Sequence, residues 1–170
     1  MRQSRNKGYE ILSLLRSKAV MLENISKLLT GDILKNLCDM GHGDTLVIAD
    51  GNFPGVRTAA QATIKKVIYT PGVTATDLYK AILEVFPLDI NYTECPVEVM
   101  DLTPSDKAKG MPDPEIWGEI DKISACKYDG LKCKKIEREE FYRRAEKAFA
   151  VIVTGEERIY GNILITKGIV

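Results

Sequence analysis

Residues 40–50 have the sequence Met40-Gly-His-Gly-Asp-Thr-Leu-Val-Ile-Ala-Asp50. In the segment before them, apolar residues recur at steps of three and four from Ile33 to Met40, which predicts a helix that ends at Gly41. Thr45–Ala49 is a continuous apolar run of the kind found in buried strands, and Asp50 ends it. A helix, a tight turn and a buried strand in direct succession indicate a layered α/β fold.

The same alternation continues along the rest of the chain. Thr74–Asp77 is a capping sequence that begins a helix, and Pro87 ends that helix. Strands separated by helices predict an α/β domain with a largely parallel sheet. The other predicted elements are strands over 66–69, 96–102, 149–154 and 162–166, helices that begin at 113 and 138, and a polar loop over 107–112.

The composition is that of a globular protein, with 170 residues, 45% hydrophobic and 28% charged. The 24 basic and 24 acidic residues balance, so no net field favours nucleic acid or an anionic membrane as a partner. The longest apolar runs are too short to span a bilayer, and no convincing signal peptide is present. Four cysteines without CxxC spacing are expected to be reduced thiols in a cytoplasmic protein, although Cys126 and Cys133 could pair.

The first 20 residues differ from the rest, since Met1–Ala19 carries five basic residues against the single acid Glu10. Tyr9, Leu12 and Leu15 have helical spacing, which is compatible with a basic helix that binds a membrane surface or a partner. The simpler interpretation is an N-terminal extension, helical or disordered. We therefore expect residues 1–20 to be an extension and residues 21–170 to form one domain.

His42 is the only histidine in the chain, and glycines flank it on both sides. Histidine is the side chain whose unperturbed pKa lies near neutrality, so proton transfer by an imidazole has one place to occur. Asp44 is close enough in sequence to support the ring. The alternative is that His42 only caps the preceding helix, where the helix dipole favours a cation.

Two further segments carry groups suited to a polar ligand. Asp50 follows a predicted strand, and in open α/β sheets ligands bind at the carboxyl ends of strands. Tyr160, Gly161 and Asn162 place a phenol, a flexible backbone and an amide together, which suits a polyol. The alternative for this triplet is an ordinary hairpin turn.

Several common signatures are absent from the sequence. There is no GxGxxG or GxxxxGK[ST] motif for nucleotides and no GxSxG nucleophile elbow. A single histidine also excludes a histidine-rich metal site. We expect neither a cofactor nor a metal.

The segments Met40–Asp50 and Asn52–Pro54 together resemble the L-fucose mutarotase and D-ribose pyranase family. The C-terminal half matches the same family in Phe141–Ala145 and Ala148–Glu156, in the triplet 160–162 and in the ending 167–168. The match runs in order from about Met21 to Val170. Gly43 and Gly161 favour the fucose branch, since ribose pyranases tend to carry threonine and alanine there.

The resemblance implies a three-layer α/β/α sandwich and cytoplasmic, ring-shaped homo-oligomers whose active sites are shared between neighbouring subunits. It implies a monosaccharide mutarotase that interconverts L-fucose anomers by acid/base ring opening, with D-ribose pyranase activity or sugar binding without turnover as alternatives. The site residues that it implies are His42 as proton donor and Asp50, Arg138, Tyr160, Gly161 and Asn162 as sugar-binding residues. Asp44, which the resemblance does not assign, is expected from its position to support His42 or to bind a sugar hydroxyl.

Overall fold

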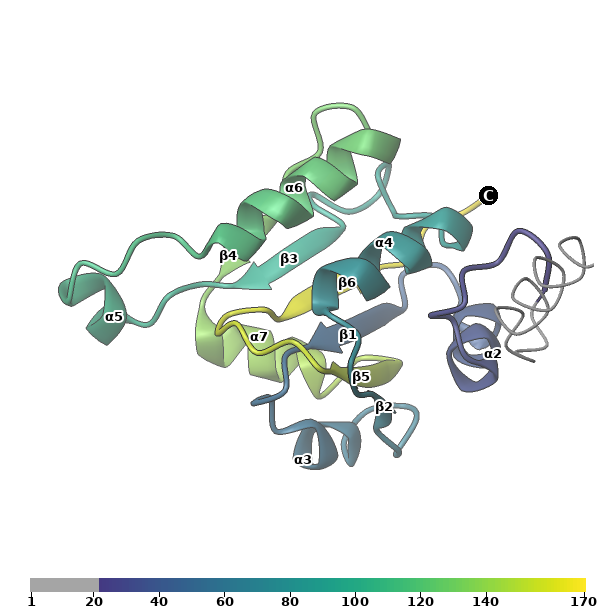
Figure 1. Cartoon of the computed structure of the whole chain (residues 1–170), viewed down its shortest axis with the longest axis horizontal. Helices are drawn as coiled ribbons and strands as arrows, with labels where there is room; N and C mark the ends of the chain where they lie inside the picture. The colour runs from purple at the N-terminus through teal and green to yellow at the C-terminus, as the bar shows by residue number, and fades with distance from the viewer. Residues whose placement is uncertain (1–21) are drawn as a thin grey trace, which may run out of the picture.

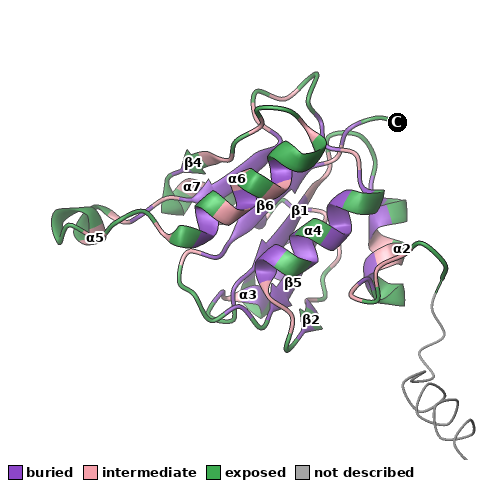
Figure 2. Cartoon of the chain, turned by 45° about the horizontal axis from the view of Figure 1, so that its top comes forward, coloured by how far each residue is buried: buried purple, intermediate pink, exposed green. Residues whose placement is uncertain are grey.

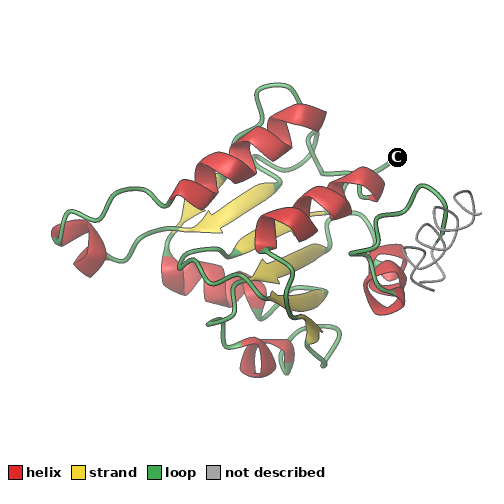
Figure 3. Ribbon diagram, in the orientation of Figure 1, coloured by secondary structure: helices red, strands yellow, loops and turns green. Residues whose placement is uncertain are grey.

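The computed structural model describes residues 22–170, so the predicted extension over 1–20 lies outside the described residues. Figure 3 shows a central sheet with helices packed around it. The strands are β1 (Thr45–Ala49), β2 (Ile68–Thr70), β3 (Val97–Met100), β4 (Lys134–Ile136), β5 (Ala150–Thr154) and β6 (Ile163–Thr166). The helices are α2 (Gly31–Asp39), α3 (Gly55–Ala59), α4 (Ala75–Val85), α5 (Pro104–Ala108), α6 (Glu115–Lys127) and α7 (Arg138–Ala145).

The six strands lie in the order β2-β5-β1-β6-β3-β4. β1 pairs parallel with β5, and β3 pairs parallel with β4, whereas β6 runs antiparallel to both β1 and β3. The prediction of a largely parallel sheet is therefore confirmed, with β6 as the exception among the described strands. Because β6 is reversed, the residue after β1 lies beside the residue before β6.

Helices cover both faces of the sheet, which confirms the α/β/α layers (Figures 1 and 2). On one face, β-strand side chains such as Ile48 and Ile163 pack with α2, α4 and α6. On the other face, Val47 and Val151 pack with Phe141 of α7 and with α3. Alternate residues of one strand thus reach different cores, because successive side chains point to opposite faces.

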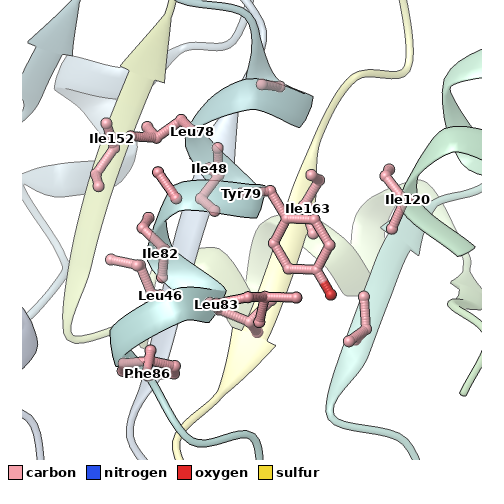
Figure 4. Close-up of a cluster of buried hydrophobic side chains, with 14 of the residues drawn as sticks. Leu46, Ile48, Leu78, Tyr79, Ile82, Leu83, Phe86, Ile120, Ile152 and Ile163 are labelled. Atoms are coloured by element: carbon pink, nitrogen blue, oxygen red, sulfur yellow. The ribbon is translucent and has the colours of Figure 1, made fainter. Parts of the chain in front are cut away.

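Helix α4 shows how the sequence pattern produces this packing (Figure 4). Thr74 caps the helix by accepting a hydrogen bond from the backbone nitrogen of Asp77, as the capping sequence predicts. Tyr79 is fully buried among aliphatic side chains, and its hydroxyl lies 2.8 Å from Ser124 Oγ. Burial of one such large side chain stabilises the fold by about 1.5–3 kcal/mol, provided that its polar atom has a partner.

Three short elements, α3, α5 and β4, were not predicted from the pattern, because none is long enough to show a period. Helix α3 packs closely on β5, since a Cβ on Gly55 would lie 2.4 Å from Val153 Cγ2. Helix α5 overlaps the predicted loop over 107–112 and projects from the body (Figure 1).

The four cysteines, all within the described part of the chain, are free thiols, so Cys126 and Cys133 do not pair. Among residues 22–170, no helix is long and apolar enough to cross a bilayer.

Candidate functional site

A pocket of about 400 Å³ lies at the carboxyl end of β1. This volume is within the range of small-molecule sites. Four of the predicted site residues, Asp50, Arg138, Tyr160 and Asn162, line it. The other lining residues come from the loop after β1, from the end of β3 and the segment around α5, from α7 and from the loop before β6: Asn52, Phe53, Met100, Thr103, Ser105, Asp106, Tyr142 and Ile159.

Asp50 and Asn162 form the floor of this pocket, and both are buried. Asn162 Nδ2 donates to Asp50 Oδ2 at 2.8 Å, and the backbone nitrogen of Asp50 donates to Asn162 Oδ1 at 3.0 Å. The backbone nitrogen of Asn52 donates to Asp50 Oδ1 at 2.9 Å. The antiparallel pairing of β1 with β6 brings these residues together. Both carboxylate oxygens are held by donors from the protein, and a carboxylate, which can accept about four hydrogen bonds, retains capacity to accept from a ligand hydroxyl.

The surroundings of Asp50 have opposing effects on its protonation. Burial raises the pKa of this carboxyl above its ordinary value of 3.8, while hydrogen bonds from Asn52, Asn162 and the Gly161 backbone act against the rise. The result is a poorly solvated acceptor at the base of the pocket, where a hydrogen bond from a neutral hydroxyl group is stronger than in water.

Tyr160 has a backbone φ of 63°, which is uncommon for a residue with a side chain. Trp117, which is 4% exposed, holds this conformation by donating from Nε1 to the Tyr160 carbonyl oxygen at 3.3 Å. The Tyr160 hydroxyl donates to Asp106 and accepts from the backbone nitrogen of Thr103 at 3.2 Å. Trp117 is therefore a core residue that also orients the phenol towards the pocket.

Gly161 is buried and lies outside the pocket lining. A Cβ at this position would lie 2.9 Å from Glu156 Cγ and 3.2 Å from the Arg158 carbonyl oxygen. The absence of a side chain therefore lets the loop before β6 close on itself, which places Tyr160 and Asn162 on either side of it.

Arg138 is the first residue of α7, and its guanidinium carbon lies 5.5 Å from the centre of the Tyr142 ring. Phe53 also stacks on Tyr142, with 5.6 Å between the two ring centres. The sequence analysis did not identify Tyr142 or Phe53 as site residues. The spacing of four between Arg138 and Tyr142 is the available signal, since residues four apart share a helix face.

Asp106 is a further pocket residue that the sequence analysis missed. Its side chain accepts from Thr103 Oγ1 at 3.0 Å, and its backbone nitrogen donates to the same hydroxyl at 3.2 Å. The hydrogen bond from Tyr160 is the main cause that lowers the pKa of Asp106, followed by the one from Thr103. The Thr-x-x-Asp spacing predicts this helix cap but does not predict its contact with Tyr160.

His42 lies at the opposite edge of the sheet, in the turn before β1. Its Nε2 lies 3.4 Å from Asp89 Oδ2, and its ring meets the Tyr92 ring edge-on with 5.1 Å between centres. The side chain is 43% exposed. Hydrogen bonds from Thr93 Oγ1 and the backbone nitrogen of Tyr92 hold Asp89 in place, and the first of these is the main cause that lowers its pKa.

Asp89 was not identified from the sequence, because it lies 47 positions after His42 (89 minus 42) and no motif joins them. The carboxylate of Asp44 bonds to the backbone of the turn and not to the imidazole of His42. Its Oδ2 accepts from the backbone nitrogen of Gly41 at 2.6 Å, so it closes the turn that carries His42.

The candidate site therefore falls into two parts within one chain. His42 precedes β1 and Asp50 follows it, and the five residues of β1 alone extend about 16 Å. A proton-transfer group must lie within about 3 Å of the atom it serves, or act through one water. The structure brings four of the predicted sugar-binding residues together in one pocket, with Gly161 in the adjoining loop, and leaves His42 at the other edge.

Glu156 stabilises the loop that carries Tyr160 and Asn162 through hydrogen bonds. Arg158 donates to both of its carboxylate oxygens at 2.9 Å, and these hydrogen bonds lower the pKa of Glu156 below its ordinary value of 4.5. Glu156 is 3% exposed and the Arg158 side chain is 41% exposed, so solvent screens the pair in part. A depressed pKa in the folded state contributes stability that is present above the unfolded value and is lost as the pH falls through the folded value.

We therefore expect Glu156→Gln to lower the free energy of unfolding by about 1–3 kcal/mol at pH 7. The difference in the free energy of unfolding between this variant and the unmodified protein should become smaller as the pH falls below about 4.5. Urea unfolding at pH 7 and at several acidic values measures both quantities, with exposed Glu157→Gln as the matched control. If the variant's loss of stability is the same at every pH in this range, the ionised Glu156 carboxylate does not stabilise the fold through Arg158.

Comparisons with known proteins agree with this fold. The RbsD/FucU transport protein family matches residues 23–170. A fucose mutarotase of Danio rerio is 44% identical over 151 residues, which cover 89% of this chain and 95% of the relative. A fucose mutarotase of Homo sapiens is 41% identical, with 88% and 95% covered.

Solved structures give the same relationship. The fucose mutarotase of Streptococcus pneumoniae in complex with L-fucose is 36% identical, with a TM-score of 0.77, and the alignment covers 88% of this chain and 99% of that one. The structural similarity thus extends over nearly the whole of both proteins. This chain belongs to the RbsD/FucU transport protein family.

Proposed function

We propose that this protein is an L-fucose mutarotase, an isomerase that interconverts the α and β anomers of the free sugar. The observation that carries the proposal is the pocket in which Asp50, Arg138, Tyr160 and Asn162 converge. Relatives named as fucose mutarotases, 36–44% identical over most of this chain, support the same activity. The four free thiols are compatible with action in the cytoplasm.

The chemistry is a proton exchange on a cyclic hemiacetal. The ring oxygen gains a proton, the anomeric hydroxyl loses one, and the bond between C1 and the ring oxygen breaks. After rotation of C1 the hydroxyl re-forms on the other face, with the protons returned, so the reaction has no net change in composition. Asp50, Arg138, Tyr160 and Asn162 orient the sugar hydroxyls, and His42 acts as the acid/base.

His42 can take this part only if it comes from a second copy of the chain, because in its own chain it lies at the far edge of the sheet. Its partial exposure and its neighbours support such an assembly. Ile90 and Tyr92 beside it are 51% and 69% exposed, and Ile169 near the same edge is 54% exposed. Exposed apolar groups of this kind are typical of protein interfaces. We propose a ring-shaped homo-oligomer in which the His42 edge of one subunit closes the pocket of the next.

Saturation-transfer proton NMR tests the proposed activity directly. Saturating the anomeric proton of α-L-fucose should reduce the β signal in the presence of the protein, well beyond the effect in buffer. The same experiment with D-galactose and D-ribose serves as the comparison. Faster pyranose–furanose exchange of ribose would instead assign a ribose pyranase, and calorimetric sugar binding without enhanced exchange would assign a non-catalytic sugar-binding protein.

A further inference from the structure

Lys167 lies directly after β6, at the same edge of the sheet as His42. Its ammonium group donates to the carbonyl oxygens of Leu37 at 2.8 Å and Met40 at 2.6 Å. These two carbonyls belong to the last turn of α2 and to its cap. Carbonyl groups at a helix C-terminus lack partners within the helix, and a cation there also interacts favourably with the helix dipole. Helix α2 has no basic residue of its own in its last turn.

The backbone of Lys167 also binds the turn that carries His42. The backbone nitrogen of Gly43 donates to the Lys167 carbonyl oxygen at 2.8 Å, and the Lys167 nitrogen donates to the Asp44 carbonyl oxygen at 2.8 Å. Within the described residues, these are the backbone hydrogen bonds that join residues 41–44 to another segment. Lys167 thus contacts the polypeptide on both sides of the imidazole.

The turn needs such an external support because two of its residues, Gly41 and Gly43, are glycines. Gly43 has a φ of 83°, and glycine is the residue with the widest choice of backbone conformations. The contact between Asp44 and Gly41 closes the turn internally but does not anchor it to the sheet. The Lys167 side chain supplies the external support on the other side of the imidazole, where it donates to the carbonyl oxygens of Leu37 and Met40 that precede Gly41.

We infer that Lys167 is a positioning residue for the proposed mutarotase reaction, which holds the His42 turn against the end of β6. The inference rests on the proposed function, but its structural part concerns this turn alone. Lys167 does not line the sugar pocket. Its loss should therefore affect the proton-transfer step and leave sugar binding intact. A small displacement of a catalytic group can lower the rate by about 100-fold.

The test compares Lys167→Met, Lys167→Arg and the exposed-lysine control Lys122→Met. We expect Lys167→Met to lower kcat for fucose exchange by about 10- to 100-fold with little change in KM. Lys167→Arg, which keeps a cation with several donors, should restore most of kcat. Lys122→Met should behave as the parent protein. All variants are assayed well below their unfolding temperatures.

A second readout does not depend on activity. Because His42 is the only histidine, protein labelled with ¹³C at histidine Cε1 shows one imidazole signal. We expect this signal to shift or broaden in Lys167→Met and to remain unchanged in Lys122→Met. If the parent protein shows no fucose exchange, the proposed function fails while the imidazole signal still tests the positioning. If Lys167→Met leaves both the imidazole signal and kcat unchanged, the inference is overturned. It is also overturned if the loss of kcat accompanies dissociation of the oligomer, because Lys167 would then be an interface residue.

Discussion

Replacement of His42 by alanine is expected to lower protein-catalysed exchange between L-fucose anomers by about 10²–10⁴-fold, the usual contribution of a positioned acid/base. No other imidazole exists in the chain to take over the proton transfer. The fold should survive, because the side chain is 43% exposed and its described contacts are those with Asp89 and Tyr92. Saturation-transfer NMR at equal protein concentration measures the loss.

A matched variant separates proton transfer from local structure. Tyr92→Phe keeps the ring beside His42 and removes a hydroxyl at a position that is 69% exposed, so it should retain most of the activity. Calorimetric titration with L-fucose should give affinities for His42→Ala within a few-fold of the parent, since the pocket is intact. Exchange by His42→Ala that equals the parent rate would remove this residue from the mechanism.

The second large effect is expected when two inactive variants are combined in one oligomer. One variant is His42→Ala, and the other is the pocket variant Asp50→Asn with Arg138→Ala. If each site takes His42 from one subunit and the pocket from its neighbour, random mixing yields about one intact site in four. Oligomers of either variant alone should have almost no activity, whereas the mixed oligomers should reach about a quarter of the rate of the unmodified protein.

This result follows from the geometry of β1. His42 and Asp50 lie at opposite ends of a strand that extends about 16 Å, so one sugar cannot touch both within a chain. The variants should be co-expressed, or unfolded and refolded together, so that the subunits mix. As the control, the two variants are mixed after each has assembled separately, so that no subunits exchange, and this mixture should stay inactive. Mixed oligomers that are no more active than either variant alone would show that the sites are not shared in this way.

Much of the fold was predictable because its evidence is local. The capping threonine of α4, the apolar run of β1 and the strand over β5 each depend on residues adjacent in sequence. The short elements α3, α5 and β4 were not predictable, since three to five residues carry no period. Their formation depends on packing, as in the approach of Val153 to Gly55.

The chemistry of the site was also accessible from residue types and motifs. A lone histidine between glycines, an aspartate after a buried strand and the Tyr160–Asn162 triplet were all recognisable as candidates. Their individual roles were less accessible. Asp44 was expected to support His42 or to bind a hydroxyl, and its carboxylate accepts from the backbone of Gly41 in the His42 turn, a contact that spacing alone does not specify.

Local sequence thus accounts for the layered α/β class and for the choice of candidate site residues, because both depend on side-chain chemistry and short-range periodicity. The partners of those groups depend on strand order and direction. Asp50 meets Asn162 across 112 positions only because β6 runs antiparallel to β1, and Asp89 meets His42 through the return of the chain beside β6. The same arrangement places His42 away from the pocket of its own chain, because a strand is extended and separates the residues at its two ends.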